Sequence, residues 1–483
     1  MELKQLVQDI VQDGFTIPLV DISHLCTHSE DATDGSLFVA VYGSSFDGHD
    51  FINQAIDNGA SAVISNGRDM GDLTVPNIKV ANPRLAVSRV AATYYANPTK
   101  ELTVIGITGT NGKTTTASIV QSIFKANGMN SAQLGTLGII ADGFTSEKSL
   151  TTPDPISLQK IFRDFVDQGI THVVMEVSSH ALDQLRVADV EFDIAVFTNL
   201  SPDHLDYHHT MDDYFHAKSK LFHALPITGT AIINFDDPRG EAMARESQAP
   251  VVKLSKNGDT DIYFSELSQS IHGIQGVIKA GEHEVKINSS MVGEFNVENI
   301  LSAVSVGISL GIKPDIIDSG VSACDFVEGR MEVFNLENGA TVIVDYAHTP
   351  DAYEKVLSTI SGMKSSSGKL HVLFGCGGDR DTTKRPEMGR IAEHYSDLLW
   401  ITPDNPRSES IAEINAEILN GLSTDQFCIF DDRGKGLQKA LSQLESSDIL
   451  VVLGKGRENG QEIDGQTHPY SDIEIIEKAV HAN

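Results

Sequence analysis

The residues with the clearest chemical meaning in this 483-residue chain are Gly109-Thr-Asn-Gly-Lys-Thr114. They lie between an apolar run at residues 102–107 and a helical pattern that begins at Thr114. In a strand–loop–helix of this kind, glycines let backbone N–H groups approach a phosphate, Lys113 adds positive charge, and the hydroxyl of Thr114 or Thr115 can reach Mg²⁺. The strict pattern has a glycine where this chain has Ile107, so the loop is a shorter variant. Its context predicts nucleotide binding.

Other polar residues follow the next two predicted strands. Glu176 ends the apolar run 171–177, and a carboxylate beside a phosphate loop commonly holds the magnesium of a nucleotide. His204 and Asp206, after the run 194–198, either ligate a metal or cap and pack their loop. Lys218 lies in a helical stretch, and its local pattern indicates an ordinary solvent-facing lysine.

Two further motifs carry arginines beside glycines or turn residues. Arg380 lies in Gly375-Cys-Gly-Gly-Asp-Arg-Asp381, and Arg407 ends Asp404-Asn-Pro-Arg407. A guanidinium binds a carboxylate through two parallel hydrogen bonds, so these motifs suggest carboxylate recognition. An ordinary turn with a surface arginine explains each motif equally well.

Alternating apolar strands and helical patterns indicate an α/β protein with three domains, at residues 1–99, 100–331 and 332–483. The first is an α/β domain with strands at 37–41 and 60–64 and a helix at 51–59. The second has a parallel sheet of the P-loop ATPase type, with strands at 102–107, 171–177, 194–198 and 230–234, an antiparallel piece at 251–292 and a helix at 296–310. The third is doubly wound and Rossmann-like, with strands at 341–345, 370–374, 398–401, 427–430 and 449–453, and helices starting near Asp351, Arg385, Ser410 and Gly436. Ligands of such folds collect at the carboxyl ends of the strands, where the motifs lie.

Composition excludes several classes of protein. The 36 basic and 67 acidic residues give a net charge of −31, which argues against non-specific nucleic-acid binding. No apolar run is long enough to cross a membrane, the N-terminus lacks the pattern of a secretory signal, and the four cysteines form no C-x-x-C pair. These features predict a cytoplasmic protein without disulfides or a zinc site.

Together the motifs resemble the Mur ligase family of ATP-dependent amide-forming enzymes, and within it the members that add a diamino acid. The resemblance covers essentially the whole chain, through eight motifs in the family's order: 108–115, 175–180, 198–208, 293–299, 329–332, 345–350, 404–407 and 454–458. It implies transfer of the ATP γ-phosphate to the D-Glu γ-carboxylate of UDP-MurNAc-L-Ala-D-Glu. An amine of meso-2,6-diaminopimelate then attacks the acyl phosphate, in a step of peptidoglycan precursor synthesis. The implied partners are therefore small molecules, with no nucleic acid and no membrane insertion, and the expected state is a monomer.

The resemblance also assigns residues by position. The catalytic residues would be Lys113, Glu176, His204 and Lys218, and Mg²⁺ would be held by Thr114, Glu176, His204 and a carbamylated Lys218, which inverts the solvent-facing reading of that lysine. ATP would bind Gly109, Thr110, Asn111, Gly112, Lys113, Thr114, Thr115, Asn296, Asn299, Arg330 and Asp345. The UDP-linked substrate would bind Ser29, Ser44, Ser45, Phe46, Thr151, Thr152, Ser178, Gln184 and Arg186. Diaminopimelate would bind Arg380, Asp404, Asn405, Pro406, Arg407, Gly454 and Glu458.

Arg407 bears on the choice of amino acid. Diaminopimelate has a carboxylate at its far end, whereas lysine ends in an ammonium group, so an arginine favours the former and repels the latter. The alternatives are a lysine-adding ligase, a ligase similar to folylpolyglutamate synthase, which lacks this first block, and a nucleotide-binding regulator without ligase chemistry. The chain departs from the family pattern at His28 and Glu30, around the uridine pocket, and at Arg457, where the family has histidine.

Overall fold

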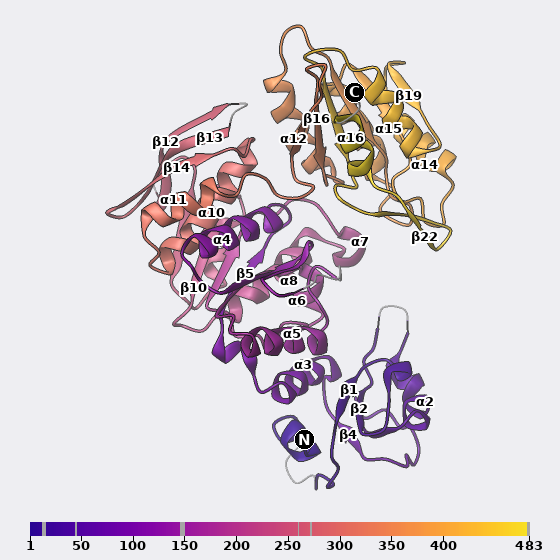
Figure 1. The fold of residues 1–483 in the computed structure, drawn as a ribbon. Helices are drawn as coiled ribbons and strands as arrows, with labels where there is room; N and C mark the ends of the chain where they lie inside the picture. Colours follow the sequence, from indigo (N-terminus) through magenta and orange to yellow (C-terminus); the bar gives the residue numbers. More distant parts are fainter. Residues whose placement is uncertain (12–15, 44–45, 145–149, 259, 271–272, 481–483) are drawn as a thin grey trace.

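The computed structural model describes residues 1–11, 16–43, 46–144, 150–258, 260–270 and 273–480. These residues form three large sheets with their helices, which follow one another from the N-terminal domain at the bottom of Figure 1 to the C-terminal domain at the top. A two-stranded ribbon is added near the C-terminus.

The N-terminal domain has a four-stranded parallel sheet in the order β1-β2-β3-β4. Its elements are α1 (Leu3–Val7), β1 (His24–Cys26), η1 (Ser29–Asp31), β2 (Ser36–Val39), η2 (Gly48–Phe51), α2 (Ile52–Asp57), β3 (Ala60–Ser65), β4 (Asn77–Lys79) and α3 (Pro83–Tyr94). The strands predicted at 37–41 and 60–64 correspond to β2 and β3, and the predicted helix to α2. Asn82 caps α3 by accepting a hydrogen bond from the Leu85 N–H, and Pro83 occupies its first position.

The central domain has a ten-stranded sheet in the order β14-β13-β12-β11-β10-β9-β5-β8-β6-β7. Its elements are η3 (Pro98–Glu101), β5 (Thr103–Thr108), α4 (Lys113–Ala126), β6 (Ser131–Gly135), β7 (Gly138–Ile140), α5 (Pro155–Asp167), β8 (His172–Glu176), α6 (Ser179–Asp183), β9 (Ile194–Phe197), α7 (Leu205–His208), α8 (Met211–His223), β10 (Thr230–Asn234), α9 (Gly240–Arg245), β11 (Val251–Ser255), β12 (Ile262–Ser270), β13 (Gly273–Ala280), β14 (His283–Ser289), α10 (Glu294–Ser309) and α11 (Pro314–Ser322). The predicted antiparallel piece is wrong in part. β11 pairs parallel with both β10 and β12, and only β12, β13 and β14 pair antiparallel.

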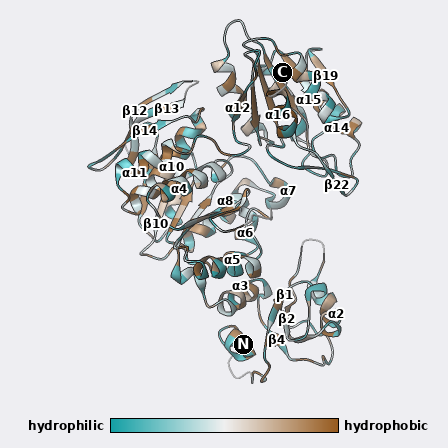
Figure 2. Ribbon diagram, viewed as in Figure 1, coloured by the Kyte–Doolittle hydropathy of each residue, from teal (hydrophilic) through white to brown (hydrophobic). Residues whose placement is uncertain are grey.

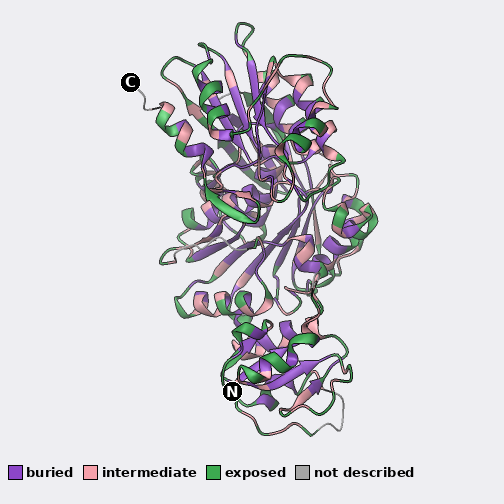
Figure 3. Ribbon diagram, turned by 90° about the vertical axis from the view of Figure 1, so that its right-hand side faces the viewer, coloured by how far each residue is buried: buried purple, intermediate pink, exposed green. Residues whose placement is uncertain are grey.

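Strand β5 explains why the predicted strands of this sheet are apolar throughout. Ile105 and Ile107 pack into the core that includes residues of α4 and α10, whereas Val104 packs into the core on the opposite face, with residues of α5 and α8. A strand whose two faces are both covered is hydrophobic at nearly every position, and exceptions such as Thr108 and Glu176 stand at strand ends. Figure 3 shows the strands of this sheet in the colour of buried residues and exposed residues on the helices outside them.

The C-terminal domain has a six-stranded sheet in the order β15-β16-β20-β17-β18-β19. Its elements are β15 (Glu332–Asn335), β16 (Thr341–Asp345), α12 (Pro350–Met363), β17 (Leu370–Phe374), α13 (Lys384–Tyr395), β18 (Leu398–Ile401), α14 (Ile411–Leu419), β19 (Phe427–Ile429), α15 (Arg433–Ser442), β20 (Ile449–Leu453), β21 (Gly460–Ile463), β22 (Gln466–Pro469) and α16 (Asp472–Val480). All five predicted strands are present, and they pair parallel to one another. The sequence analysis missed the antiparallel edge strand β15. Figure 2 shows hydrophobic residues concentrated on the strands of this sheet.

Both larger sheets end their parallel strands in the loops that carry the predicted motifs. β5 leads into the phosphate loop and β8 ends at Glu176, while β16 ends at Asp345 and β20 is followed by Gly454. Among the helices of the described residues, none combines the length and the hydropathy needed to span a bilayer.

Candidate active site

The loop between β5 and α4 has the backbone of a phosphate cradle. Gly109 and Gly112 have φ values of +150° and +86°, where side chains are strained. A Cβ atom at Gly109 would clash with the Thr198 hydroxyl, and one at Gly112 would clash with the Asn299 carboxamide. Both glycines are therefore required by conformation and by space, and α4 begins immediately after the second of them.

Lys113 folds back over this loop. Its Nζ donates hydrogen bonds to the carbonyl oxygens of Gly109 and Thr110, both at 2.9 Å. Burial lowers the pKa of Lys113, while the negative charges of Glu176 and Asp203 oppose that change. The ammonium group is thus held where the outer phosphates of a nucleotide would lie.

Glu176 is 1% exposed, and three hydrogen bonds hold its carboxylate. The Thr114 hydroxyl donates to Oε2 at 3.0 Å, and Thr136 donates to the carboxylate through its backbone N–H at 2.8 Å and its hydroxyl at 3.2 Å. Glu176 forms no ion pair with any of the residues that the structure describes. A buried carboxylate without a cationic partner, beside a threonine hydroxyl, is a donor set that suits Mg²⁺.

Lys218 is buried, at 1% exposure, so the solvent-facing interpretation of this lysine is wrong. Its Nζ donates to the Gly109 carbonyl at 2.7 Å and lies 4.5 Å from the centre of the Tyr214 ring. Burial lowers the pKa of Lys218 well below its usual value, and the positive charge of Lys113 lowers it further, whereas Asp203 opposes both. The structure therefore favours a neutral amine directly behind the phosphate loop.

His204 and Asp206 are exposed on the surface of the protein and are not buried with Glu176 and Lys218. His204 adopts a left-handed backbone with φ +54°, its side chain is 43% exposed, and Nε2 lies 3.4 Å from Asp203 Oδ2. Its ring packs edge-on against His180, with ring centres 4.8 Å apart. Among the described residues, no three His, Cys, Asp or Glu side chains converge as a complete metal site. A bound magnesium would therefore need hydroxyls, a modified Lys218 or substrate oxygens as additional ligands.

A cavity of about 400 Å³ lies where the central domain meets the linker to the C-terminal domain. Asn296 and Asn299 are buried beside it, with the Asn299 amide donating to Asn296 Oδ1 at 3.0 Å and the Asn296 amide donating to the Val292 carbonyl at 2.8 Å. The cavity is lined by Thr115, Ser290, Met291, Val292, Asn296, Asp325, Phe326, Val327, Arg330, Met331, Glu332 and Val333. Its volume is within the range of small-molecule sites, and it lies next to the phosphate loop through Thr115.

Arg330 lines this cavity, and Asp345 is hydrogen-bonded to Met331, another residue of the lining. The Arg330 guanidinium lies 4.9 Å from the centre of the Tyr346 ring. The Asp345 carboxylate accepts the backbone N–H groups of Met331, at 2.8 Å, and Ala347, at 2.7 Å. Burial raises the pKa of Asp345, although Arg330 opposes the rise. Thr115, Asn296 and Arg330 thus line one cavity, and Asp345 holds the backbone beside it.

The residues predicted for the UDP-linked substrate fall into two groups. In the central domain they form one hydrogen-bonded cluster: Arg186 donates to Gln184 Oε1 at 3.1 and 2.6 Å and to the Thr152 carbonyl at 2.9 Å, and the Ser178 N–H donates to the Thr152 hydroxyl at 3.1 Å. Thr151 precedes Thr152 of this cluster, and its hydroxyl forms a 3.2 Å hydrogen bond with the hydroxyl of Thr136, which also binds Glu176.

The other group lies in the N-terminal domain. The Ser29 hydroxyl donates to Gln54 Oε1 at 3.1 Å, and Phe46 is 73% exposed. Ser44 and Ser45 lie outside the described residues.

Arg84 is a residue near this cluster that the sequence analysis did not identify. From the first turn of α3, its Nη2 donates to the Tyr42 carbonyl at 2.5 Å. Its charge also acts across to the central domain. Burial lowers the pKa of Arg186, and repulsion from Arg84 lowers it further. Neither arginine forms an ion pair with the described residues, although the negative charge of Asp154 opposes the lowering of the Arg186 pKa.

The amine site predicted in the C-terminal domain is built around Gly377. The two atoms nearest to a Cβ placed on this glycine belong to Arg407 and Arg380, so the structure brings both arginines together. Arg407 has a left-handed backbone with φ +52°, and its guanidinium donates to Glu462 Oε2 at 3.0 Å and to the Gly378 carbonyl at 2.7 Å. Arg380 is exposed to solvent. Arg407 is thus held by two strong hydrogen bonds, whereas the exposed Arg380 donates one long bond to the Asp379 carbonyl, at 3.4 Å.

Glu458, which was predicted to bind an ammonium group of the substrate, already accepts three hydrogen bonds within the protein. Its carboxylate accepts Lys455 Nζ at 2.7 Å, the Asn405 amide at 3.1 Å and the Tyr346 hydroxyl at 3.1 Å. Burial opposes ionisation of Glu458, yet the charge of Lys455 holds its pKa below the usual value. Lys455 is fully buried and also binds Asn405 Oδ1 at 2.9 Å. In the sequence, only the position of Lys455 inside the motif 454–458 indicated that this lysine lies beside Glu458.

The remaining predicted residues of this region lie beside Glu458 and Asn405. Gly454 has φ +105°, and a Cβ on it would approach the Asp404 carboxylate. Pro406 is buried and precedes Arg407. Arg457, where the family pattern has histidine, pairs with Glu332 through Nε and Nη2, at 3.0 and 2.5 Å. That departure therefore forms a contact with β15 and leaves Glu458 in place.

Comparison with known proteins matches almost the whole chain to one family. Residues 21–95 match the description "Mur ligase family, catalytic domain", residues 107–307 "Mur ligase middle domain", and residues 329–456 "Mur ligase, glutamate ligase domain". UDP-N-acetylmuramoyl-L-alanyl-D-glutamate–2,6-diaminopimelate ligase of Geobacter metallireducens is 39% identical over 95% of this chain and 94% of its own. The protein of that name from Aquifex aeolicus is 40% identical over 95% of this chain and 93% of its own. A solved structure with the same name superimposes with a TM-score of 0.70 at 29% identity, covering 100% of this chain and 99% of the other.

Proposed function

The chain belongs to the Mur ligase family, and on that premise we propose that it joins meso-2,6-diaminopimelate to the D-Glu γ-carboxylate of UDP-MurNAc-L-Ala-D-Glu, with hydrolysis of ATP to ADP and phosphate. The observation that carries the proposal is the near-full-length identity to relatives that bear this one name. It covers the domain at residues 21–95 as well, which disfavours a ligase of the folylpolyglutamate synthase type.

A carboxylate is a poor electrophile, so the first task of the site is to phosphorylate it. The phosphate loop and Lys113 would hold the triphosphate, and the cavity beside Asn296 and Arg330 would hold the nucleoside. Attack of a carboxylate oxygen on the γ-phosphorus breaks the bond to ADP and forms an acyl phosphate. The two anions meet beside Lys113, whose charge offsets their repulsion.

The donor set around Glu176 supports a divalent cation in this step. Thr114 and Glu176 would hold Mg²⁺, which would neutralise phosphate charge when it is bound. The Thr136 hydroxyl and N–H keep the Glu176 carboxylate aligned whether or not the ion is present.

Lys218 would be carbamylated, and its surroundings support that role. Carbamylation needs a neutral amine to capture carbon dioxide, and the burial of Lys218 favours the neutral form. The product would be an anion beside Lys113, and the positive charge of Lys113 would attract it. With His204 it would supply further oxygen and nitrogen ligands for a second cation.

The amine half of the reaction would use the loops around Gly377. Arg380 and Arg407 would bind the carboxylates of diaminopimelate, with Asp404, Asn405, Gly454 and Glu458 around its ammonium groups. Because Glu462 already neutralises one edge of Arg407, only part of the guanidinium is available, and the site would be selective for a single carboxylate geometry.

The UDP-linked substrate would lie between Ser29 and Phe46 on one side and the cluster of Thr152, Ser178, Gln184 and Arg186 on the other. Its diphosphate and carboxylates would be attracted by the guanidinium groups of Arg84 and Arg186. We further propose that the enzyme is a cytoplasmic monomer with domain boundaries near residues 99/100 and 331/332.

The deciding experiment compares acceptors in one ATP-hydrolysis assay. With UDP-MurNAc-L-Ala-D-Glu present, phosphate release should require meso-diaminopimelate and should be weak with L-lysine or glutamate. Preferential use of lysine would overturn the proposed substrate. Phosphate release that is independent of both co-substrates would overturn the ligase assignment itself.

A further inference from the structure

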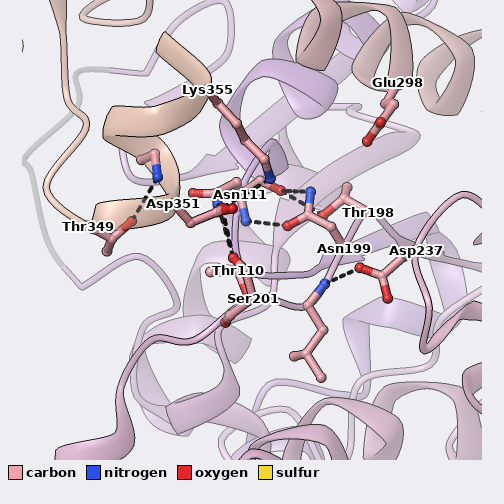
Figure 4. Close-up of polar contacts among 12 residues, drawn as sticks. Thr110, Asn111, Thr198, Asn199, Ser201, Asp237, Glu298, Thr349, Asp351 and Lys355 are labelled. Atoms are coloured by element: carbon pink, nitrogen blue, oxygen red, sulfur yellow. Dashed lines mark hydrogen bonds and ion pairs between the residues drawn. The ribbon is translucent and has the colours of Figure 1, made fainter. Parts of the chain in front are cut away.

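A hydrogen-bonded contact joins the C-terminal domain to the phosphate loop of the central domain. Asp351, in the first turn of α12, accepts a hydrogen bond on Oδ2 from the Asn111 side-chain amide at 2.9 Å and another from the Ser201 hydroxyl at 2.9 Å. Figure 4 shows the carboxylate of Asp351 directed at these two donors. The contact thus connects the domain predicted to bind the amine with the loop predicted to bind ATP.

The geometry of α12 places Asp351 at this boundary. Thr349 caps the helix by accepting a hydrogen bond from the Ala352 N–H at 3.3 Å, and Pro350 occupies the first turn. Helix α12 directly follows the turn after β16, which ends at Asp345. The short connection between β16 and α12 therefore places Asp351 six residues after the end of that strand.

Lys355 makes the boundary complementary in charge. One turn along α12, its Nζ lies 3.0 Å from Asp351 Oδ2. Burial raises the pKa values of Asp237 and Glu298 in the central domain, and the charge of Lys355 is among those that oppose the rise. The central domain therefore presents two carboxylates to Lys355 and two hydrogen-bond donors to Asp351 (Figure 4).

The partner of Asp351 on the phosphate loop is itself held firmly. The Asn111 N–H donates to Asn199 Oδ1 at 2.9 Å, and the Asn111 carbonyl accepts the Thr198 hydroxyl at 2.7 Å. Backbone bonds on both sides leave the carboxamide as the free end of Asn111. Because the backbone of Asn111 is held in this way, a hydrogen bond to its short side chain fixes the C-terminal domain relative to the loop.

We propose that Asp351 is a positioning residue, which seats the C-terminal domain on the phosphate loop so that the bound diamine faces the acyl phosphate. This inference rests on the proposed ligase function, since it concerns the step in which groups held by two domains react. The reaction needs the amine within bonding reach of an acyl carbon, and small displacements of such a pair are costly. Asp351 would act through the placement of a domain and would touch neither substrate.

Steady-state kinetics of Asp351→Ala, Asp351→Asn and Ser201→Ala test the proposal. For Asp351→Ala we expect kcat/KM for diaminopimelate to fall about 10- to 100-fold, which corresponds to the loss of hydrogen bonds to a charged group, while KM for ATP changes less than about twofold. Asp351→Asn keeps an oxygen that can accept both bonds, so it should recover most of the activity. Ser201→Ala should show a smaller defect, and the double variant Ser201→Ala/Asp351→Ala should be no worse than Asp351→Ala. Ser358→Ala, on the exposed side of α12, is the matched control.

Small-angle X-ray scattering of the same full-length variants supplies a readout that does not depend on activity. Asp351→Ala without nucleotide should have a larger radius of gyration than the wild type and the Ser358→Ala control. Wild-type kinetics and wild-type scattering in Asp351→Ala would overturn the positioning role, as would an Asp351→Asn variant as impaired as Asp351→Ala. If the wild type itself fails to use diaminopimelate, the proposed function falls, and the scattering result still decides whether the contact holds the domains together.

Discussion

At the scale of single residues, Lys218 illustrates how burial changes what a side chain can do. On a helix surface it would be a hydrated cation, but here it lies behind the phosphate loop, against Tyr214 and the Gly109 carbonyl. No carboxylate forms an ion pair with it among the described residues, and burial lowers its pKa even though Asp203, the Gly109 carbonyl and the Tyr214 ring favour the charged form. The same burial that disfavours an ammonium group prepares the amine to react.

Replacement of Lys218 by alanine should lower kcat by at least about 100-fold, because a ligand and charge partner at the site of phosphate transfer is lost. Formate or acetate, which can occupy the vacated volume as anions, should restore part of the rate. Lys220→Ala is a suitable control, since that lysine lies on the same helix, is 42% exposed and pairs with Asp183. Full activity of Lys218→Ala without added acid would rule out the carbamate.

Arg407→Ala should raise KM for diaminopimelate at least about tenfold, since one charge-assisted pair with a carboxylate is lost. KM for ATP should stay within about twofold, because Arg407 lies in a different domain from the phosphate loop. Glu462→Gln, which removes the partner that holds the guanidinium but keeps the arginine, should give an intermediate effect. An unchanged KM for diaminopimelate in Arg407→Ala would contradict the assignment.

His208 should make the central domain sensitive to acid. Burial lowers its pKa from 6.5 to about 4, and the neighbouring His180 adds to the shift. The unfolded chain therefore binds more protons between these values, so this contribution to stability is complete above pH 6.5 and is lost as the pH falls toward 4. The lost free energy of unfolding is on the order of 3 kcal/mol at most. Urea titrations followed by circular dichroism at pH 4.5 and 7 should show a smaller pH difference for His208→Gln than for the wild type. His468→Gln, in the exposed strand β22, should behave as wild type.

At the scale of elements, one buried ion pair ties the last helices of the C-terminal domain to its sheet. Arg433 at the start of α15 donates to the Asp472 carboxylate at the start of α16, with Nη2 and Oδ2 2.8 Å apart and both side chains fully buried. Nη2 also donates to the Leu453 carbonyl at 2.9 Å, where β20 ends before Gly454. The pair thereby connects the packing of two helices to the loop that carries Lys455 and Glu458.

Arg433→Met should destabilise the C-terminal domain by about 3–5 kcal/mol, because Asp472 is left buried without a cation. The double variant Arg433→Met/Asp472→Leu should recover most of that loss, since no charge remains to be compensated. Trp400 is the only tryptophan of the chain and is fully buried in this domain, so its fluorescence reports the transition. Lys364→Met, which breaks a more exposed pair with Asp397, should cost less than about 1 kcal/mol. Equal effects of the two single variants would contradict the special role of the buried pair.

At the scale of the whole molecule, the net charge of −31 sets the electrostatic conditions under which three domains work together. The acidic excess repels itself in the compact state, and dissolved ions screen that repulsion. Surrounding acidic charge lowers the positive potential at any basic residue, so the proposed substrate residues Lys113, Arg84 and Arg186 must attract anions against the net charge of the chain.

The melting temperature should rise by several degrees between about 10 mM and 500 mM NaCl, since screening relieves the self-repulsion of the folded chain. Differential scanning fluorimetry at constant pH measures the change. NaCl is preferable to a sulfate salt, which would stabilise the protein through its exclusion from the surface as well. A melting temperature that is independent of NaCl would show that the surface charges are already balanced locally.

The sequence by itself determined the elements and the chemistry of the loops. A strand covered on both faces is apolar at nearly every position, so β5 and β20 could be recognised as apolar runs, and parallel strands place their following loops on one edge. Gly112 could be recognised in the sequence as part of the phosphate-loop motif, because its positive φ and its contact with Asn299 favour glycine at that position. The edge strand β15 escaped prediction, since it is short and carries polar residues that solvent tolerates, whereas β19 at the opposite edge was predicted.

Only the tertiary structure decided which isolated residues act together. Lys218 has the local pattern of a surface lysine, and its burial depends on contacts with a loop 109 residues away. The pairing of Lys455 with Asn405 across 50 residues, and of Asp351 with Asn111 across 240 residues, likewise has no local signature. Desolvation and charge pairing depend on neighbours brought close by folding, and the spacing of residues along the chain carries no record of them.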